Sequence, residues 1–250
     1  MNLPDIVDGL PPTSLTYQRE PYSVSVEGTV IRAVKEQGSN YYLVLASTIF
    51  HPKGGGQPSD TGSLEGDGFT MQVKKALKTG YHVVLYGRCT GMPSEGPCRQ
   101  EIEWDKRLLY MRRHAAAHLF DGVLAQVSGR AFEPLDSWLG EDAYVAYRGD
   151  FPGDETGTRA EKEANRAIAE GRAVNVEIVK PEMLSGLRHF WSSVLQDQKE
   201  IRLVTVEGFE PIPCAGTHVR NTKEIGGVKV SSTESTPDGF RIHFDVGAAT

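Results

Sequence analysis

The first hundred residues alternate between apolar and polar positions after a proline-rich start. Residues 1–21 contain four prolines and few apolar positions, so we expect an irregular arm there. From Tyr22 onward the alternation has the period of half-buried strands. The predicted strands cover Tyr22–Ile31, Tyr41–Ala46, Thr70–Leu77, Tyr81–Tyr86 and Gln100–Trp104. About five or six short strands at this spacing predict a small β-barrel.

A glycine-rich loop interrupts these strands at residues 51–62, with the sequence HPKGGGQPSDTG. Three successive glycines, Gly54, Gly55 and Gly56, remove every side chain from one turn and free the backbone φ angles. A plain surface hairpin is the simpler interpretation of the glycines alone. The neighbouring His51, Lys53 and Gln57 favour a loop that contacts a ligand.

The second part of the chain mixes helical and strand patterns. Asp105 as N-cap and Gly129 as terminator predict a helix from Lys106 to about Val127. A second helix is predicted over Thr158–Ala169, ending before Gly171, with its charges facing solvent. Strands are predicted within residues 131–149 and over Val174–Val179, Ile201–Val206, Val228–Ser232 and Phe240–Val246, with a short helix or turn over Pro181–Leu187. The predicted fold class is therefore α+β, with a β-barrel domain over residues 1–103 and an α+β domain over residues 104–250.

Composition and charge exclude several classes of protein. Charged residues make up 24% and hydrophobic residues 39%, as in ordinary globular proteins. The sequence has no apolar run near the ~20 residues of a membrane span and no signal peptide pattern, so we expect a cytoplasmic protein. Three cysteines make a poor disulfide framework. The net charge of −6 means that any nucleic-acid-binding surface must be a local patch.

Two four-residue spacings predict a metal site. His114 and His118 share one face of the predicted helix, so both imidazoles can point at one ion. Cys214 and His218 flank a Gly-Thr turn that can bring them to one side. Either spacing alone is common by chance, but together they supply the nitrogen and sulfur donors that Zn²⁺ prefers. We therefore expect one zinc ion per chain.

The order of four motifs, HPKGGGQPSDTG, WDKRLLYMRRHAAAHL, CAGTHVRNTKEIGG and FRIHF, resembles the trans-editing alanyl-tRNA deacylases of the AlaX type. These enzymes are related to the editing domain of alanyl-tRNA synthetase and, more distantly, of threonyl-tRNA synthetase. The glycine loop is typical of the medium form. The resemblance extends from about residue 22 to residue 246. It implies a barrel and an editing domain, a zinc held by His114, His118, Cys214 and His218, and hydrolysis of seryl- or glycyl-tRNA(Ala).

Such hydrolysis suits a zinc ion, which lowers the pKa of bound water to about 7 and polarises a carbonyl. A catalytic zinc keeps one open position, so we expect one of the four candidate ligands, a histidine, to give way to water or substrate. The expected partner is the acceptor end of tRNA. The residues expected to contact it are Gly54, Gly55, Gly56, Gln57, Arg112, Arg113, Thr217 and Arg241, with Lys53 and Arg107 as further phosphate contacts. Solvated surface charge is an equally good interpretation of any single basic residue.

Three alanines depart from the motifs of the resembling enzymes. Those enzymes usually have Thr or Ser where this chain has Ala115, and Gly or Cys where it has Ala215; Ala117 also lacks a hydroxyl. The missing hydroxyl leaves the amino acid open: serine, glycine, another small or non-standard residue, or threonine as in threonyl-type editing. A zinc-containing tRNA-binding module without catalysis is the other alternative. The residues do not decide the oligomeric state, and a monomer is compatible with them.

Overall fold

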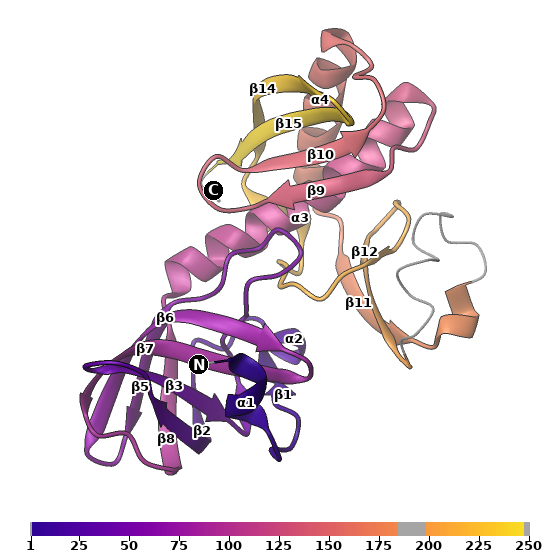
Figure 1. Cartoon of the computed structure of the whole chain (residues 1–250). Helices are drawn as coiled ribbons and strands as arrows, with labels where there is room; N and C mark the ends of the chain where they lie inside the picture. The colour runs from indigo at the N-terminus through magenta and orange to yellow at the C-terminus, as the bar shows by residue number, and fades with distance from the viewer. Residues whose placement is uncertain (1, 185–198, 248–250) are drawn as a thin grey trace. The chain divides into compact units, whose positions relative to one another are not determined.

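The computed structural model describes residues 2–184 and 199–247 (Figure 1). The chain divides into two compact units, one of residues 1–54 and 58–108 and one of residues 55–57 and 109–250. Gly55–Gln57 therefore packs with the second unit although it lies within the first in sequence. No helix in the described ranges is long and apolar enough to cross a membrane.

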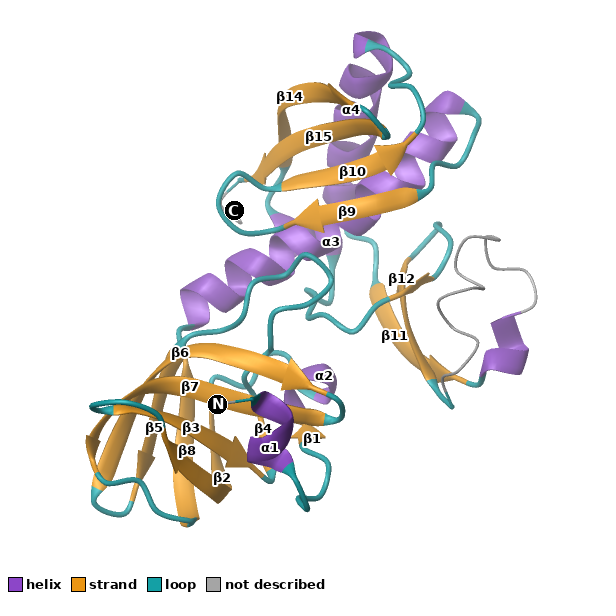
Figure 2. Cartoon of the chain, viewed as in Figure 1, coloured by secondary structure: helices purple, strands orange, loops and turns teal. Residues whose placement is uncertain are grey.

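Six antiparallel strands of the first unit close into a barrel in the order β2-β3-β7-β6-β5-β8 (Figure 2). Their bounds are β2 Ser25–Lys35, β3 Asn40–Leu45, β5 Gly62–Gly66, β6 Phe69–Thr79, β7 His82–Gly91 and β8 Gly96–Ile102. The predicted barrel is confirmed. The sequence reading missed β5, because this strand begins and ends in glycine and points only Leu64 into the core.

The barrel interior follows from the period of two along its strands. In β6, Phe69, Met71 and Val73 are buried and the residues between them are exposed. A bulge between Val73 and Lys75 shifts the register, and burial resumes at Ala76. Side chains from β3 and β7, including Leu43 and Leu85, complete the same core cluster. Alternation along each strand thus fills one closed core.

The irregular arm predicted for residues 1–21 is wrong. This segment contains α1 (Leu3–Val7), β1 (Ser14–Leu15) and α2 (Thr16–Arg19), and β1 pairs with β4 (Ser47–Thr48). Pro4 lies in the first turn of α1, where a missing N–H costs no hydrogen bond. Ile6 and Val7 of α1 pack in a small cluster with Val44 and Val84. Tertiary burial, not local pattern, orders this arm.

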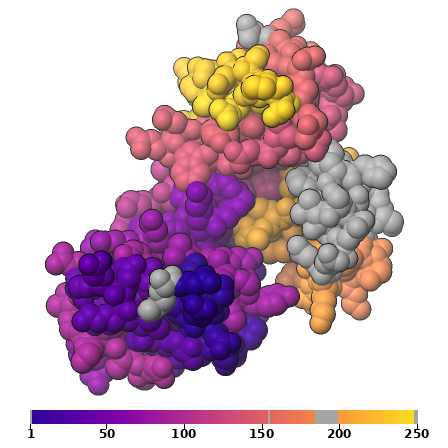
Figure 3. Space-filling view, viewed as in Figure 1, coloured from indigo at the N-terminus to yellow at the C-terminus, as the bar shows by residue number. Residues whose placement is uncertain are grey.

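The second unit contains two antiparallel sheets and most of the long helix α3. The four-stranded sheet has the order β14-β15-β10-β9, and the three-stranded sheet has the order β11-β12-β13. In the space-filling view, the yellow atoms of β14 and β15 lie beside the salmon atoms of β10 (Figure 3). The bounds are α3 Trp104–Ser128, β9 Pro134–Trp138, β10 Tyr144–Arg148, α4 Asp154–Glu170, β11 Val174–Val179, η1 Pro181–Leu184, β12 Ile201–Val206, β13 Ile212–Pro213, η3 Thr222–Ile225, β14 Val228–Thr236 and β15 Gly239–Val246.

Helix α3 begins at Trp104, so Asp105 lies within its first turn and is not the predicted N-cap. Gly129, with φ +72°, follows the helix as predicted. The alanines and Leu119-Phe120 of α3 are buried, and the ring of Phe120 lies 5.1 Å from that of Phe244 on β15. These contacts place α3 against the four-stranded sheet.

The second predicted helix is observed as α4, which buries Ala160, Ala164 and Ala167 on one face. It ends at Gly171, whose φ of +74° is the left-handed conformation of a helix C-cap. The short helix predicted over Pro181–Leu187 is observed as far as Leu184, and residues 185–187 lie outside the described ranges.

Candidate metal centre and its cavity

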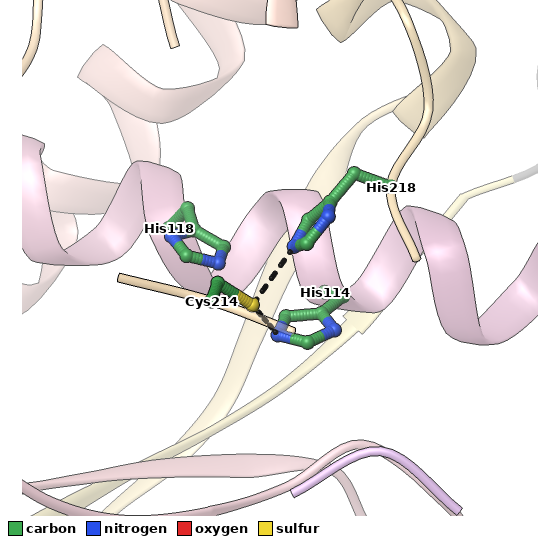
Figure 4. Close-up of side chains that lie close together, drawn as sticks. All are labelled: His114, His118, Cys214 and His218. Atoms are coloured by element: carbon green, nitrogen blue, oxygen red, sulfur yellow. Dashed lines mark hydrogen bonds between the residues drawn. The ribbon is translucent and has the colours of Figure 1, made fainter. Parts of the chain in front are cut away.

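The two four-residue spacings meet in space within the second unit. His114 and His118 project from α3, and Cys214 and His218 project from the segment after β13 (Figure 4). The potential ligand atoms of the four residues all lie within 4.8 Å of one another. Cys214 Sγ is 3.3 Å from His114 Nε2 and 3.6 Å from His218 Nε2. The cluster can therefore hold a metal ion.

Burial affects the protonation of His118 and Cys214 in this cluster. The three histidines are 3–6% exposed. Burial, with the nearby charge of Arg202, lowers the pKa of His118 to about 4, so at neutral pH its imidazole is uncharged. Burial also raises the pKa of the Cys214 thiol to about 11. A metal ion binds the neutral imidazole and the thiolate, so binding at this site displaces the thiol proton.

Strand β12 holds the segment that carries Cys214. The Cys214 N–H donates to the Arg202 carbonyl at 2.9 Å, and the Arg202 guanidinium donates to the Cys214 carbonyl at 2.7 Å. The Gly216 N–H donates to Cys214 Sγ at 3.4 Å, a contact that favours negative charge on the sulfur. The backbone of this segment is thus fixed at both ends of the cysteine.

Gln57, from the glycine loop, orients His114 (Gln57 is 0% exposed). The His114 Nδ1–H donates to Gln57 Oε1 at 2.9 Å, and the Thr217 N–H donates to the same oxygen at 3.0 Å. Gln57 Nε2 in turn donates to Thr217 Oγ1 at 2.8 Å. A hydrogen bond at Nδ1 leaves the lone pair of Nε2 directed at the cluster. Gln57 and Thr217, both expected to contact substrate, are buried here and support a candidate ligand.

Two glycines permit these close approaches. Gly56 has φ +76°, and a Cβ added to it would lie 2.7 Å from the Ser137 carbonyl oxygen. A Cβ on Gly216 would lie 2.5 Å from His114 Nδ1. Of the three loop glycines, Gly55 and Gly56 line a cavity beside the cluster, whereas Gly54 is exposed and lies outside its lining. Gly56 and Gly216 therefore permit close packing within this unit.

The cavity has a volume of about 360 Å³, within the range of small-molecule sites. His114, Ala117, His118 and Asp121 of α3 line it at helical spacings of three and four, and Cys214 and Ala215 line it from the other side. Ala115 is 0% exposed and lies off this face. This placement does not support a substrate contact for a hydroxyl at position 115, whereas positions 117 and 215 do face the cavity.

Two of the arginines expected to contact phosphate are buried in structural contacts. The guanidinium of Arg107 forms an ion pair with Asp60 and donates to the carbonyls of Pro21 and Ile49. The guanidinium of Arg113 donates to Asp245 at 2.9 Å and to the carbonyls of Leu139 and Gly140. Groups with these partners are withdrawn from solvent, so this placement does not support a phosphate contact for either residue.

Arg112 and Arg241 are less enclosed. Arg112 is partly buried and donates to the Ile225 carbonyl at 2.7 Å. Arg241 lies 3.5 Å from Glu234 and stacks over the Tyr144 ring at 4.8 Å, with 38% of its side chain exposed. Lys53, in the glycine loop, is exposed. Phosphate contacts by these three residues stay predictions.

Sequence reasoning missed four polar residues of the cavity, namely Asp121, Asp136, Ser137 and Tyr147. Asp121 could have been found from the sequence, because this residue follows His118 by three positions and so shares the helix face of His114 and His118. Asp136, Ser137 and Tyr147 could not be assigned to the cavity from sequence, because only the pairing of β9 with β10 brings them to the same wall.

Comparison with known proteins identifies related sequences over both units. Residues 13–101 match the family model for tRNA synthetases class II (A), and residues 201–242 match the model for the threonyl and alanyl tRNA synthetase second additional domain. The second match contains Cys214 and His218 of the cluster.

Whole-chain relatives include two proteins named alanyl-tRNA editing protein AlaX-M. The one from Methanosarcina barkeri is 32% identical over 87% of this chain and 92% of its own length. The one from Methanosarcina acetivorans is 30% identical over 89% of this chain and 94% of its own length. The alanine–tRNA ligase of Pyrococcus abyssi is 32% identical over 98% of this chain, which spans only 27% of that ligase.

Proposed function

Because the chain belongs to the AlaX-M family of alanyl-tRNA editing proteins, we propose that it hydrolyses the ester bond of misacylated tRNA(Ala) in trans. Serine and glycine are the amino acids that it removes. Water attacks the ester carbonyl carbon, and the free amino acid and the terminal ribose hydroxyl of the tRNA are released. The observation that carries this proposal is that three of the four potential metal ligands line one cavity of substrate size.

Zinc is the metal that fits this donor set. Tetrahedral bonds of about 2.3 Å to sulfur and 2.0–2.1 Å to nitrogen would separate sulfur from nitrogen by about 3.6 Å. The observed sulfur–nitrogen distances of 3.3 Å and 3.6 Å are close to that value. His114, His118, Cys214 and His218 would hold the ion. When bound, it would supply a water with a pKa of about 7 and polarise the ester carbonyl.

The residues around the cluster have separate tasks in the proposed reaction. Gln57 keeps the Nε2 of His114 available as a ligand through the bond at Nδ1. The Gly216 N–H and the Arg202 guanidinium hold the cysteine and its segment in place. Gly55 and Gly56 let the aminoacyl end approach the loop backbone without meeting a side chain. The fold therefore presents the ester to a rigid, largely buried donor set.

The proposed partner is the acceptor end of tRNA, and the proposed location is the cytoplasm. With 27 basic and 33 acidic residues, the chain attracts a polyanion only where basic side chains are locally exposed. Lys53, Arg112 and Arg241 are the candidates for such contacts.

A second candidate function is tRNA binding through a zinc site without catalysis. The four donors lie close enough together to saturate a tetrahedral ion, and a structural zinc has four protein ligands. The cavity favours hydrolysis instead, because it gives a substrate access to His114, His118 and Cys214. In the hydrolytic case a histidine gives way to water or substrate.

A deacylation panel separates these functions. Ser-tRNA(Ala), Gly-tRNA(Ala), Ala-tRNA(Ala) and Thr-tRNA(Thr) are each incubated with metal-loaded protein, and the release of free amino acid is followed. We expect release from the seryl and glycyl substrates, little from the correctly charged alanyl substrate, and background release from all of them with the His118→Ala variant.

The outcomes of the panel are distinct. Release of threonine alone would favour threonyl-type editing. Release of another small amino acid would show that the enzyme prefers that amino acid to serine and glycine. A metal-loaded protein that binds tRNA and hydrolyses none of the four substrates would support the non-catalytic module and end the hydrolase proposal.

A further inference from the structure

A carboxylate, held in place by a tyrosine, shares the cavity with the candidate metal ligands. Asp121 lies three residues after His118 on α3 and lines the same cavity. The Tyr147 hydroxyl, on β10, donates to Asp121 Oδ1 at 2.6 Å. Tyr147 is 1% exposed, so it holds the carboxylate from a fixed position. A carboxylate has about four acceptor positions, and the Tyr147 hydroxyl occupies one of those of Asp121.

Apart from the candidate metal ligands, the residues that line the cavity are complementary to a cation. Asp121 and Asp136 contribute two carboxylates to its wall, and none of the described residues that line it is a lysine or arginine. The aminoacyl end of a charged tRNA has one cationic group, the α-ammonium of the esterified amino acid. A charge-assisted bond between ammonium and carboxylate is among the stronger hydrogen bonds in proteins.

We propose that Asp121 binds the α-ammonium group of the esterified amino acid, so that the cavity selects aminoacyl esters with a free amino group over N-acylated ones. This inference rests on the proposed function, because it names how the same cavity recognises its substrate. Tyr147 is the positioning residue that holds the Asp121 carboxylate.

The spacing of the two groups suits an amino acid. Backbone bond lengths put the α-nitrogen about 2.5 Å from the ester carbonyl carbon. A charge-assisted hydrogen bond adds about 2.8 Å, so the carboxylate should lie about 5 Å from the reacting carbon. Three residues of α-helix separate Asp121 from His118 by about 4.5 Å along the axis. The axial distance between the two positions is therefore close to the span that the amino acid requires.

Asp121 fits this role better than Asp136. The Asp136 side chain is exposed and accepts from the Tyr144 hydroxyl at 2.8 Å. Asp121 is partly buried on the same helix face as both histidines of α3. Water screens an exposed charge more than a partly buried one, so discrimination by charge should depend on Asp121.

The test uses two non-hydrolysable probes, 3′-deoxy-3′-(L-seryl)amidoadenosine with a free amino group and its N-acetyl form. Dissociation constants are measured by calorimetry with the zinc-loaded full chain. We expect the wild type to bind the free-amine probe about 10- to 100-fold more tightly than the N-acetyl probe. Asp121→Asn should reduce this ratio to about one through weaker binding of the free-amine probe.

Asp136→Asn is the matched control, because it removes the other carboxylate that lines the same cavity. We expect it to retain the wild-type ratio, and Tyr147→Phe to lower the ratio partway. Circular dichroism and zinc content establish that each variant is folded and loaded. Equal affinity of the wild type for both probes would overturn the inference without any variant, and so would an unchanged ratio in folded Asp121→Asn.

Steady-state kinetics with Ser-tRNA(Ala) and N-acetyl-Ser-tRNA(Ala) distinguish this inference from the proposed function. Hydrolysis of both substrates at equal kcat/KM would leave the function standing and remove the ammonium site. A loss of kcat in Asp121→Asn that is the same for both substrates would show that Asp121 acts in the chemistry and would also contradict the proposal. Probe discrimination with no hydrolysis of any aminoacyl-tRNA would instead overturn the proposed function alone.

Discussion

The imidazole of His114 donates from Nδ1 to the side-chain carbonyl of Gln57 at 2.9 Å, across 57 positions of sequence. This one contact joins the glycine loop to the candidate metal centre. Gln57 bonds the backbone of Thr217 through the same oxygen, so it also connects the two segments that carry the histidines. The loop thus holds the candidate ligand His114 in place, and its buried Gln57 determines which nitrogen of the His114 imidazole is available to a metal ion.

Replacing Gln57 should weaken metal binding. Hydrogen-bonded partners of metal-ligating histidines typically affect metal affinity by about 10- to 100-fold, so we expect Gln57→Ala to raise the zinc dissociation constant by that factor. Competition with a chromogenic chelator measures it. Gln100→Ala is the control, since Gln100 is an equally buried glutamine that bonds Thr48 and the Ser47 carbonyl within the barrel. An equal loss of affinity in both variants would mean that Gln57 acts only through general stability.

Purified protein should contain about one zinc per chain. We expect His118→Ala and Cys214→Ser to lower the metal content well below that, because each removes one of four donors that lie within 4.8 Å of one another. Elemental analysis after dialysis measures the stoichiometry. His243→Ala, which alters a histidine of β15 that lies 3.4 Å from Glu234, should keep full metal content. Stoichiometric metal in both cluster variants would place the site elsewhere.

A methyl group at Gly56 should destabilise the loop more than one at Gly55. Both glycines have positive φ, so each substitution with alanine costs about 1–2 kcal/mol. At Gly55 the added Cβ meets no atom within 4 Å, whereas at Gly56 it meets the Ser137 backbone. We expect Gly56→Ala to lose a further ~1–3 kcal/mol, as overpacking does in a filled interior. Denaturant unfolding of the two variants measures the difference, and equal losses would contradict the close approach.

Arg113 should stabilise the fold and leave tRNA binding unchanged. We expect Arg113→Ala to lower the free energy of unfolding by about 2–4 kcal/mol, because two backbone carbonyls and Asp245 lose their donor. Arg148→Ala, which breaks an exposed ion pair with Glu133, should cost less than about 1 kcal/mol. The salt dependence of tRNA affinity should be the same in wild type and Arg113→Ala. A slope reduced by about one, with stability intact, would make Arg113 a phosphate contact.

A hydroxyl at position 117 should affect selectivity, whereas one at position 115 should not. Ala117 lines the cavity and Ala115 is buried away from it. A hydrogen bond from a new hydroxyl to the substrate serine would raise the ratio of kcat/KM for Ser-tRNA(Ala) over Ala-tRNA(Ala) by about 2- to 10-fold in Ala117→Ser. Ala115→Ser is the matched control and should keep the wild-type ratio. The reverse pattern would show that position 115 faces the substrate after all.

The local pattern of residues was enough to predict the barrel, most of its strands and the four-residue cluster. Alternation along β6 and the helical spacing of His114 and His118 are short-range periodicities, and they stay readable wherever the element lies in the fold. The His and Cys spacings also restrict the metal, because softness and geometry belong to the side chains themselves. The two pairs of candidate ligands lie about a hundred positions apart. Their closeness in space was predicted from their shared donor chemistry and not from any local sequence rule.

Tertiary structure alone decided which polar residues are exposed and which are buried. Gln57, Thr217, Arg107 and Arg113 are side chains that a sequence reading assigns to solvent or substrate, yet each is buried with a partner far along the chain. Burial of a polar group is acceptable only when a distant partner satisfies it, and sequence spacing does not reveal that partner. For the same reason the hydrogen bond between Tyr147 and Asp121 cannot be predicted from sequence, because it depends on β10 lying beside α3.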